Sequence, residues 1–343
     1  MKVKSKCEGC GGSLKFNPDK QGLYCENCGS VTPIEYKPFV KTKFLTADSS
    51  PKKQQGTAVS LKCESCGASL NIDDVIETTC PYCGSHQINC VDDGLEYIPD
   101  SIIPFGVSRA RAENIFKLWI KKRRFAPNNL KTIAILGEMK GMYFPCWLYD
   151  YKTSTFYQGV GVNTRRDSDG NTHEVRKPIS GTRNNMYFNQ IEPANDMLDT
   201  FNIEQFRDYT SIPQHEYDSS FVLGFLTANN TCRVAPAFER EKKQKAYEIE
   251  DQIKTSLPYD RIDNFRCSTT FSDVMWSYTL LPVWICDYEY KKKKYRFLIN
   301  GKTGSIVGKA PKSGWKIFFT TLGILLGVGA VIFFAMYLGG GRV

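Results

Sequence analysis

The sequence predicts an α+β protein in several parts: two small cysteine-rich units, a body of helices on antiparallel sheet, and one long apolar helix. Three observations predict this arrangement. Four CxxC pairs fall within the first 83 residues, a PxWxxDY pattern occurs twice, and 22 residues near the C-terminus carry no charge. With 343 residues, 41% of them hydrophobic, the chain can form several folded parts, and a wholly disordered or collagen-like chain is excluded.

The four CxxC pairs form two sets of similar spacing. Fourteen residues separate the pairs of the first set, and thirteen separate those of the second. Two CxxC turns brought together supply the four sulfurs that Zn²⁺ accepts in structural sites. A glycine follows each pair, as expected where the turn needs positive φ. The sequence thus predicts two zinc ions, bound by Cys7, Cys10, Cys25 and Cys28 in a ribbon over residues 1–34, and by Cys63, Cys66, Cys80 and Cys83 in a second ribbon over 61–90.

Disulfides, redox-active thiols and catalytic zinc are the alternatives for these cysteines. The N-terminal MKVKSK has no apolar stretch that could act as a signal peptide, so we expect a cytoplasmic start, where thiols stay reduced. Four cysteine ligands also close the coordination sphere, whereas catalytic zinc keeps one position open. Between the ribbons, residues 35–60 are polar and without periodicity, which predicts a flexible linker.

The charge of the ribbons disfavours nucleic acid as a partner. The whole chain has a formal charge of +9, but residues 1–34 carry only +2 and residues 61–90 carry −3. A ribbon that binds nucleic acid should present lysines and arginines to the phosphates, with aromatic side chains between them. The few aromatic residues of the ribbons are therefore expected to form small cores.

The body, residues 98–313, contains an internal repeat. Pro145–Tyr151 and Pro282–Tyr288 share the pattern PxWxxDY, 137 residues apart, and each copy reads as a half-buried strand. Each follows a predicted helix, one capped by Ser108 and a weaker one over 239–255. This pattern predicts a duplicated helix-plus-antiparallel-sheet unit, with repeats at 98–230 and 231–313. The tryptophans are expected in the core and the aspartates as turn or backbone acceptors, a binding site being the alternative.

No constellation of catalytic residues emerges. The three histidines have no carboxylate at helical metal-binding spacing, and HExxH and GxSxG are absent from the sequence. The remaining cysteines, which lie in apolar or strand-like segments, are expected to be small core residues: Cys90, Cys146, Cys232, Cys267 and Cys286. The expectation is a protein that is not an enzyme.

Positive charge gathers on the first helix of the body. Eight cations against Glu113 give +7 between residues 109 and 131. A polyanion could bind here, and anionic lipid would be the nearest one for a membrane-tethered body. The predicted contacts with an anionic surface are Arg109, Arg111, Lys117, Lys121, Lys122, Arg123 and Arg124.

Residues 317–338 predict one transmembrane helix. At about 1.5 Å per residue this uncharged run covers roughly 33 Å, the thickness of a bilayer core. Four lysines precede the run and one arginine follows it, so the bulk of the chain is expected in the cytoplasm and a short tail outside. Gly323 and Gly327 form a GxxxG pattern, which predicts contact with a second copy or with another membrane protein.

Several motifs resemble those of one family. The CxxCG ribbons, Ile103–Phe105, Tyr143–Asp150, Tyr217–Phe225 and the PxWxxDY repeat are similar to Gram-positive bacterial zinc-ribbon membrane proteins. These are often labelled TFIIB-type zinc ribbon or primosomal/replication-factor-Y-like, and some are encoded beside phage-shock PspA-like and SPFH-type proteins. The resemblance implies a component of an envelope-stress system that brings peripheral proteins to the membrane.

Two functions are therefore expected from the sequence. The first is a non-enzymatic, membrane-anchored adaptor whose ribbons dock a cytosolic protein. The alternative is a membrane-associated nucleic-acid-binding protein related to replication or primosome factors, which the basic helix permits and the acidic second ribbon disfavours. Helicase activity is not expected, because the sequence has no helicase motor motif.

Overall fold

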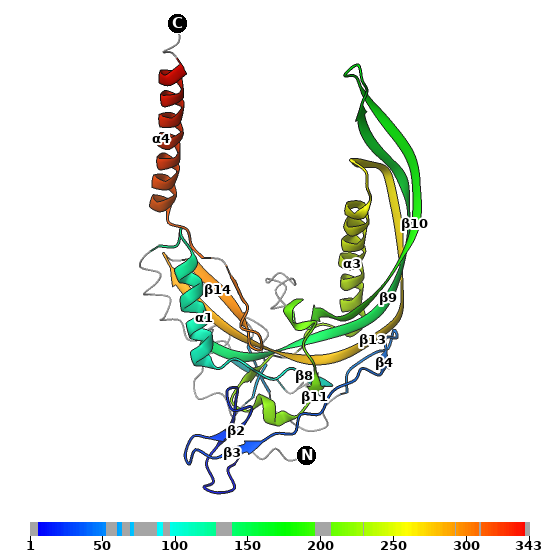
Figure 1. The fold of residues 1–343 in the computed structure, drawn as a ribbon. Coiled ribbons are helices and arrows are strands. Elements are labelled where there is room, and N and C mark those ends of the chain that lie inside the picture. The colour runs from blue at the N-terminus through cyan, green and yellow to red at the C-terminus, as the bar shows by residue number, and fades with distance from the viewer. Residues whose placement is uncertain are drawn as a thin grey trace. The chain divides into compact units, whose positions relative to one another are not determined.

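The structure is a computed structural model, and it confirms the mixed α+β class (Figure 1). Its description covers residues 6–52, 60–63, 69–71, 88–91, 97–127, 139–195, 207–228, 230–291, 293–308 and 310–339. The chain divides into two compact units, each drawn from two stretches of sequence. Unit 1 comprises residues 1–106 and 142–283, and unit 2 comprises 107–141 and 284–343. The predicted boundary after residue 230 lies within unit 1, and the duplication itself stays a prediction.

Two three-stranded antiparallel sheets belong to the N-terminal part of unit 1. The first has the order β1-β2-β3 and the second β6-β5-β7. Their strands are β1 (Leu14–Asn17), β2 (Gly22–Cys25), β3 (Val31–Pro33), β5 (Ser60–Cys63), β6 (Ser69–Asn71) and β7 (Ile88–Val91). In the first sheet, the side chain of Asn17 accepts hydrogen bonds from the N–H groups of Asp19 and Lys20, which closes the turn into β2.

A larger sheet has nine strands among the described residues, and its main path runs β10-β9-β13-β14-β15. Three of the path strands are very long: β9 (Met139–Arg166), β10 (Thr172–Pro193) and β13 (Arg261–Tyr290). β9 and β10 form one antiparallel hairpin, with a bulge between Tyr187 and Gln190 where Asn189 takes a positive φ. The remaining strands are β4 (Lys43–Phe44), β8 (Ser101–Ile102), β11 (His215–Glu216), β12 (Leu226–Thr227), β14 (Lys293–Asn300) and β15 (Ile306–Gly308).

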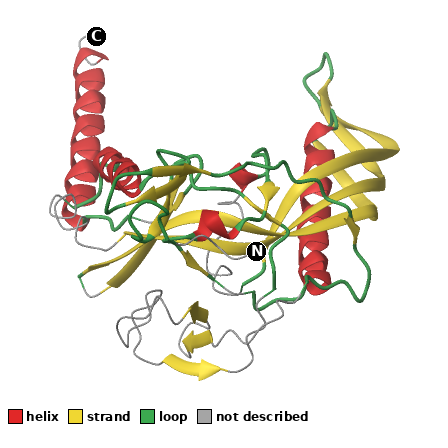
Figure 2. Cartoon of the chain, turned by 90° about the horizontal axis from the view of Figure 1, so that it is seen from below, coloured by secondary structure: helices red, strands yellow, loops and turns green. Residues whose placement is uncertain are grey.

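Helix α3 (Val234–Ser256) covers one face of the long strands of unit 1 (Figures 1 and 2). It begins five residues before the predicted start at 239, because Val234, Ala237 and Phe238 bury against the sheet. Their partners in this core include Trp147, Tyr149, Tyr151, Trp276 and Tyr278. Aromatic side chains of this size contribute most of the buried apolar area, so this contact anchors the helix.

Both tryptophans of the PxWxxDY pattern are buried, as predicted. Trp147 on β9 is fully buried, and Trp284 on β13 is nearly fully buried. The indole N–H of Trp284 donates to the carbonyl of Val107. Asp150, in the first copy, accepts a hydrogen bond of 2.7 Å from the backbone N–H of Asn189, as expected for a backbone acceptor. The first copy is thus part of the core, and Asp150 fixes the bulge of the neighbouring strand.

The segment predicted as a linker, 35–60, differs from expectation over residues 37–46. β4 pairs with β13 through Phe44 and Lys43, and the N–H of Phe39 donates to the carbonyl of Gln214. The Lys41 ammonium is buried and lies 2.6 Å from the Asp150 carboxylate. Burial lowers the pKa of Lys41, and Asp150 offsets part of that effect. A buried ion pair and sheet hydrogen bonds hold these residues along unit 1, which the polar composition does not indicate.

Replacing Asp150 by alanine is expected to lower the free energy of unfolding by about 3–5 kcal/mol, because the buried Lys41 ammonium loses its charge partner. Lys152→Ala is the matched control. Lys152 pairs with Asp273 at 2.8 Å, but both side chains are more than half exposed, so its loss should cost less than about 1 kcal/mol. Urea denaturation followed by tryptophan fluorescence measures both. Equal effects of the two substitutions would contradict the structural role of the Lys41 pair.

The first ribbon packs on the rest of unit 1 through a short 3₁₀ helix, η4 (Ser219–Val222). Phe16 meets Phe221 edge to face, with ring centroids 5.5 Å apart, and its N–H donates to the carbonyl of Leu223. The side chain of Gln21 donates to the carbonyl of Phe105. These contacts fix the ribbon to the rest of unit 1, so its exposed loops form a defined surface.

Unit 2 contains helix α1 (Arg109–Lys122), strands β14 and β15, and helix α4 (Gly314–Gly339). α1 buries Ala112, Phe116 and Ile120, as its periodicity predicts, and Phe116 stacks on Phe297 of β14. Ser108 occupies the N-cap, although its side chain makes no capping hydrogen bond. The turn at residues 300–304 joins β14 to β15 as a hairpin.

Candidate metal centre

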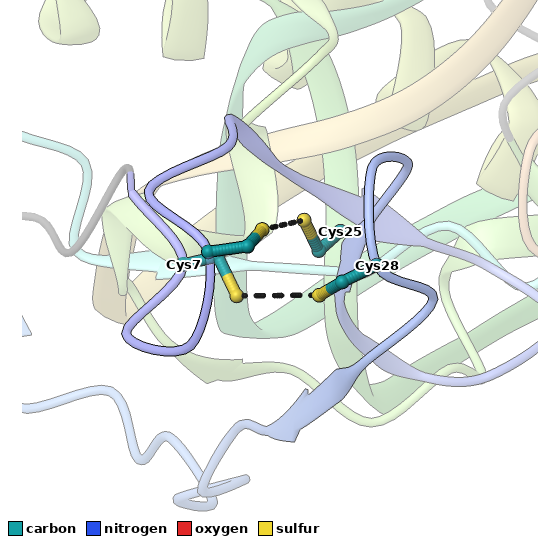
Figure 3. Close-up of side chains that lie close together, drawn as sticks. Cys7, Cys25 and Cys28 are labelled. Carbon is teal, nitrogen blue, oxygen red and sulfur yellow. Dashed lines mark hydrogen bonds between the residues drawn. The ribbon is translucent and has the colours of Figure 1, made fainter.

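The four cysteines of the first ribbon converge on one point (Figure 3). Their sulfurs all lie within 4.8 Å of one another, with 3.6 Å between Cys7 and Cys28 and 3.5 Å between Cys10 and Cys25. Four sulfurs at about 2.3 Å from a zinc ion in a tetrahedron would lie roughly 3.8 Å apart. The cluster therefore fits a tetrahedral zinc ion, and its all-thiolate donor set suits a closed structural site.

Two similar turns position these sulfurs. In each turn the N–H of the glycine after the CxxC pair donates to the carbonyl of the first cysteine, at 2.9 Å for both Gly11 to Cys7 and Gly29 to Cys25. Both glycines have positive φ, +72° and +75°, which confirms the conformation predicted from the CxxCG pattern. The equivalent glycines of the second set, Gly67 and Gly84, lie outside the described residues.

Gly29→Ala is expected to weaken zinc binding by about tenfold. An L-residue in the left-handed region costs about 1–2 kcal/mol, and the turn that presents Cys25 and Cys28 would carry this strain. Gly9→Ala is the control, because Gly9 lies in the other CxxC turn without a positive φ, and an added Cβ would have only the Cys7 sulfur nearby, at 4.0 Å. Competition with a chromogenic zinc chelator measures both affinities. Loss of affinity in Gly9→Ala alone would contradict the proposed strain.

The thiols of the cluster differ in acidity. The hydroxyl of Ser30 and the N–H groups of Cys10 and Gly9 lower the pKa of Cys7 to about 6. For Cys25, the N–H of Cys28 lowers the pKa, but burial and the neighbouring thiols raise it to about 11. Four thiolates this close together repel one another, so without a metal the thiols do not all lose their protons. A dication that replaces the protons neutralises this repulsion. The electrostatics thus favour a cation among the four sulfurs.

Ser30 is a site residue that the sequence reasoning missed. Its hydroxyl lies 3.3 Å from the sulfur of Cys7 and 3.2 Å from that of Cys28. It also lowers the pKa of Cys28. A hydroxyl donor next to ligand sulfurs stabilises thiolates as an outer-shell group. The only sequence signal is a serine two residues after the last cysteine of the set.

The second predicted metal site lies outside the described residues, apart from the backbone of Cys63 at the end of β5. One feature of its surroundings is described. In the first ribbon, Lys6, directly before Cys7, pairs antiparallel with Ser13, three residues after Cys10. In the second ribbon, Lys62 pairs with Ser69 in the same way, from positions equivalent to those of Lys6 and Ser13. Tyr24 and Val31 repeat this register around Cys25 and Cys28. The same backbone frame therefore flanks each of the three CxxC pairs whose flanking residues the structure describes.

The predicted anionic-surface residues all lie on or directly after α1, and all are exposed: Arg109, Arg111, Lys117, Lys121, Lys122, Arg123 and Arg124. Arg109 pairs with Glu113 at 3.1 Å, and the Arg123 guanidinium lies over the ring of Trp119. The helix therefore exposes a basic surface to solvent, while Ala112, Phe116 and Ile120 are buried. Contact with an anionic surface stays a prediction.

Helix α4 is long and apolar enough to cross a membrane. The most apolar 18-residue window within Gly314–Phe334 has a mean hydropathy of 2.4, and none of that window is buried. A Cβ added at Gly323 or Gly327 would meet no atom within 4 Å, so the predicted contact surface is open. The observed bounds, Gly314–Gly339, contain the predicted 317–338.

The cysteines other than the eight predicted metal ligands show no sign of a reactive thiol where they are described. Cys146 and Cys286 are buried, and burial raises the pKa of Cys146. Cys232 and Cys267 are half-buried, and burial likewise raises the pKa of Cys267. These environments suit small core residues. Cys90 has its backbone in β7, but its side chain lies outside the described residues.

Comparison with known proteins gives one distant relative. The chain is 25% identical over 334 residues to the uncharacterized protein YdjG of Bacillus subtilis (strain 168), covering 92% of each chain. No family model matches the sequence, and no solved structure matches it. The similarity therefore extends over nearly the whole length of both chains.

Proposed function

We propose that this chain is a non-enzymatic, membrane-anchored adaptor that uses its zinc ribbons to bring a cytosolic protein to the membrane. One observation carries the proposal: a closed four-cysteine site and an unburied apolar helix belong to one chain. The closed site stabilises a ribbon and leaves no position for a substrate. The ribbon's CxxC loops are exposed, with Cys10 and Cys28 at the surface, so they can meet a partner.

Two zinc ions per chain are part of the proposal. The spacing of the second cysteine set differs from that of the first by one residue, and the Lys62–Ser69 pairing repeats the Lys6–Ser13 register. A matching register at the residues that flank the CxxC pair supports a similar turn there. The second ion would bind Cys63, Cys66, Cys80 and Cys83.

The proposed location is the cell membrane of a bacterium, with α4 as a single span and the folded body in the cytoplasm. Lysines before the apolar run support this orientation. The open surface around Gly323 and Gly327 supports a second helix as partner, from another copy or another membrane protein. The resemblance to zinc-ribbon membrane proteins of phage-shock operons supports a role in envelope stress.

Site-specific crosslinking tests the adaptor function. A photoreactive residue at Asn27, in the exposed loop between Cys25 and Cys28, should capture a cytosolic protein in intact cells. The same residue at Ser168, an exposed position at the tip of the β9–β10 hairpin, is the control. The captured protein should sediment with membranes only in cells that make the intact chain. Capture of DNA or RNA from Asn27 would support the nucleic-acid alternative and overturn the adaptor.

A further inference from the structure

A cavity of about 670 Å³ lies at the base of α4, within unit 2. Its lining residues are Lys291, Lys293, Tyr295, Pro311, Lys312, Ser313, Gly314, Trp315 and Phe318. Three of these are lysines and none is acidic, so the cavity is strongly positive. Its volume is within the usual range for a site that binds a small molecule.

The cavity is built by two separate parts of unit 2. Lys293 and Tyr295 are two residues apart on β14, so both side chains leave the same face of the strand. Lys312 and Trp315 come from the segment that enters α4. This segment is held in place, because the N–H of Ser313 donates to the carbonyl of Phe125 and the ammonium of Lys316 donates to that of Ala126. Lys291, Lys293 and Lys312 therefore line one cavity, one side of which is held by these two hydrogen bonds.

Two further features favour an anion in this cavity. The first residues of α4, Gly314 and Trp315, line it, and the N-terminus of a long helix carries a partial positive charge. In addition, a run of four lysines, 291–294, leads into β14. Such a run on a strand often serves only to prevent edge pairing. Here, however, Lys291 and Lys293 face the same cavity as Lys312, which a role in edge protection does not require.

The apolar part of the lining identifies the kind of anion. Trp315 and Phe318 are largely exposed, at 71% and 55%, and they begin the apolar surface of α4. Tryptophan at the start of a span is typical of the membrane interface, the depth at which lipid phosphates lie. A phospholipid could place its phosphate among the lysines while its acyl chains lie along Phe318 and the helix beyond it.

We propose that this cavity binds the headgroup of an anionic phospholipid from the leaflet that faces the folded body. The inference rests on the proposed membrane span of α4. It assigns the role of lipid recognition to Lys291, Lys293 and Lys312, which are distinct from the basic surface of α1. Bound lipid would hold unit 2 against the membrane surface and so set how far the body stands from it.

The test uses the full chain in nanodiscs of phosphatidylcholine containing a minor fraction of phosphatidylglycerol. Native mass spectrometry of the released protein counts the phosphatidylglycerol that stays bound. The triple variant Lys291→Gln, Lys293→Gln, Lys312→Gln should retain about tenfold less than the natural chain, since each cation near the membrane surface contributes to anionic-lipid binding. The matched control is Lys52→Gln, Lys177→Gln, Lys243→Gln, which removes the same charge from exposed positions elsewhere.

Each outcome decides the proposal. Equal retention by both triple variants would overturn it, and so would displacement of the lipid by inorganic phosphate, which would show a site for a free anion. A chain that enters nanodiscs but retains no phosphatidylglycerol would overturn the lipid site and leave the membrane span intact. A chain that does not enter nanodiscs would overturn both. Equal zinc content in the variants checks that each one is folded.

Discussion

Cys28→Ser should remove zinc from the first ribbon and unfold β1, β2 and β3. A structural zinc ion contributes about 10–16 kcal/mol in small ribbons. The apolar core of this ribbon consists mainly of Leu14, Phe16 and Leu23, and each such side chain contributes only about 1.5–3 kcal/mol when buried. Without the ion these contacts cannot offset the conformational entropy of ordering the ribbon.

Zinc analysis of the purified chain measures the effect. The content should fall by about one ion per chain, to the single ion that the proposed second site would keep. Limited proteolysis should then cut within residues 6–33, while unit 1 beyond the ribbon resists. Cys267→Ser, a half-buried cysteine on β13, is the control and should keep full zinc content. A natural chain that has an ordered β1–β3 sheet without metal would contradict this account.

The metal site was predictable from the sequence because all of its determinants are local. The CxxC spacing selects the ligands, and Gly11 and Gly29 permit the turns, so no distant contact is needed. The apolar helix was predictable for the same reason, since its length and hydropathy depend on one continuous segment. The contact of Ser30 with the ligand sulfurs could not be predicted, because a single serine is not part of a recognisable sequence motif.

The course of residues 37–46 could not be predicted, because it depends on partners far along the chain. Lys41 stands in a polar stretch and reads as a solvated cation. Its partner Asp150 is 109 residues away, and no periodicity links the two. The length of β9 and β10 was equally hidden. Beyond the core, their pairing runs to Arg166 and Thr172. β9 buries the polar Thr153 and Thr155 there and exposes Phe156, and β10 is mostly exposed, so apolar residues do not mark a buried face in the sequence.

The same reasoning explains the lysine cavity. Each of its lysines alone reads as surface charge, and only the fold brings Lys291 and Lys293 together with Lys312. The sequence located the positive charge on and directly after α1, because these cations lie close together in one continuous segment. It could not indicate which cations line one cavity, because that depends on how β14 and the entry to α4 pack.

Leu325→Arg with Leu326→Arg should abolish membrane anchoring. Both leucines lie near the middle of the apolar stretch Gly314–Phe334 and are exposed. An arginine at the centre of a span costs about 2.5–3.5 kcal/mol on insertion scales, and the leucines it replaces are themselves favourable. Two such changes should lower the ratio of inserted to soluble chain by about four orders of magnitude.

Alkaline extraction of membranes, followed by detection of the chain in pellet and supernatant, measures this effect. Leu325→Ala with Leu326→Ala is the control and should stay in the pellet, because alanine keeps the stretch apolar and helical. Zinc content should be unchanged in both variants, since the ribbon site lies in unit 1 and α4 in unit 2. If the natural chain itself appears in the supernatant, α4 is not a span. The unburied apolar surface of α4 would then need a protein partner to cover it, because a helix this apolar is not stable exposed to water.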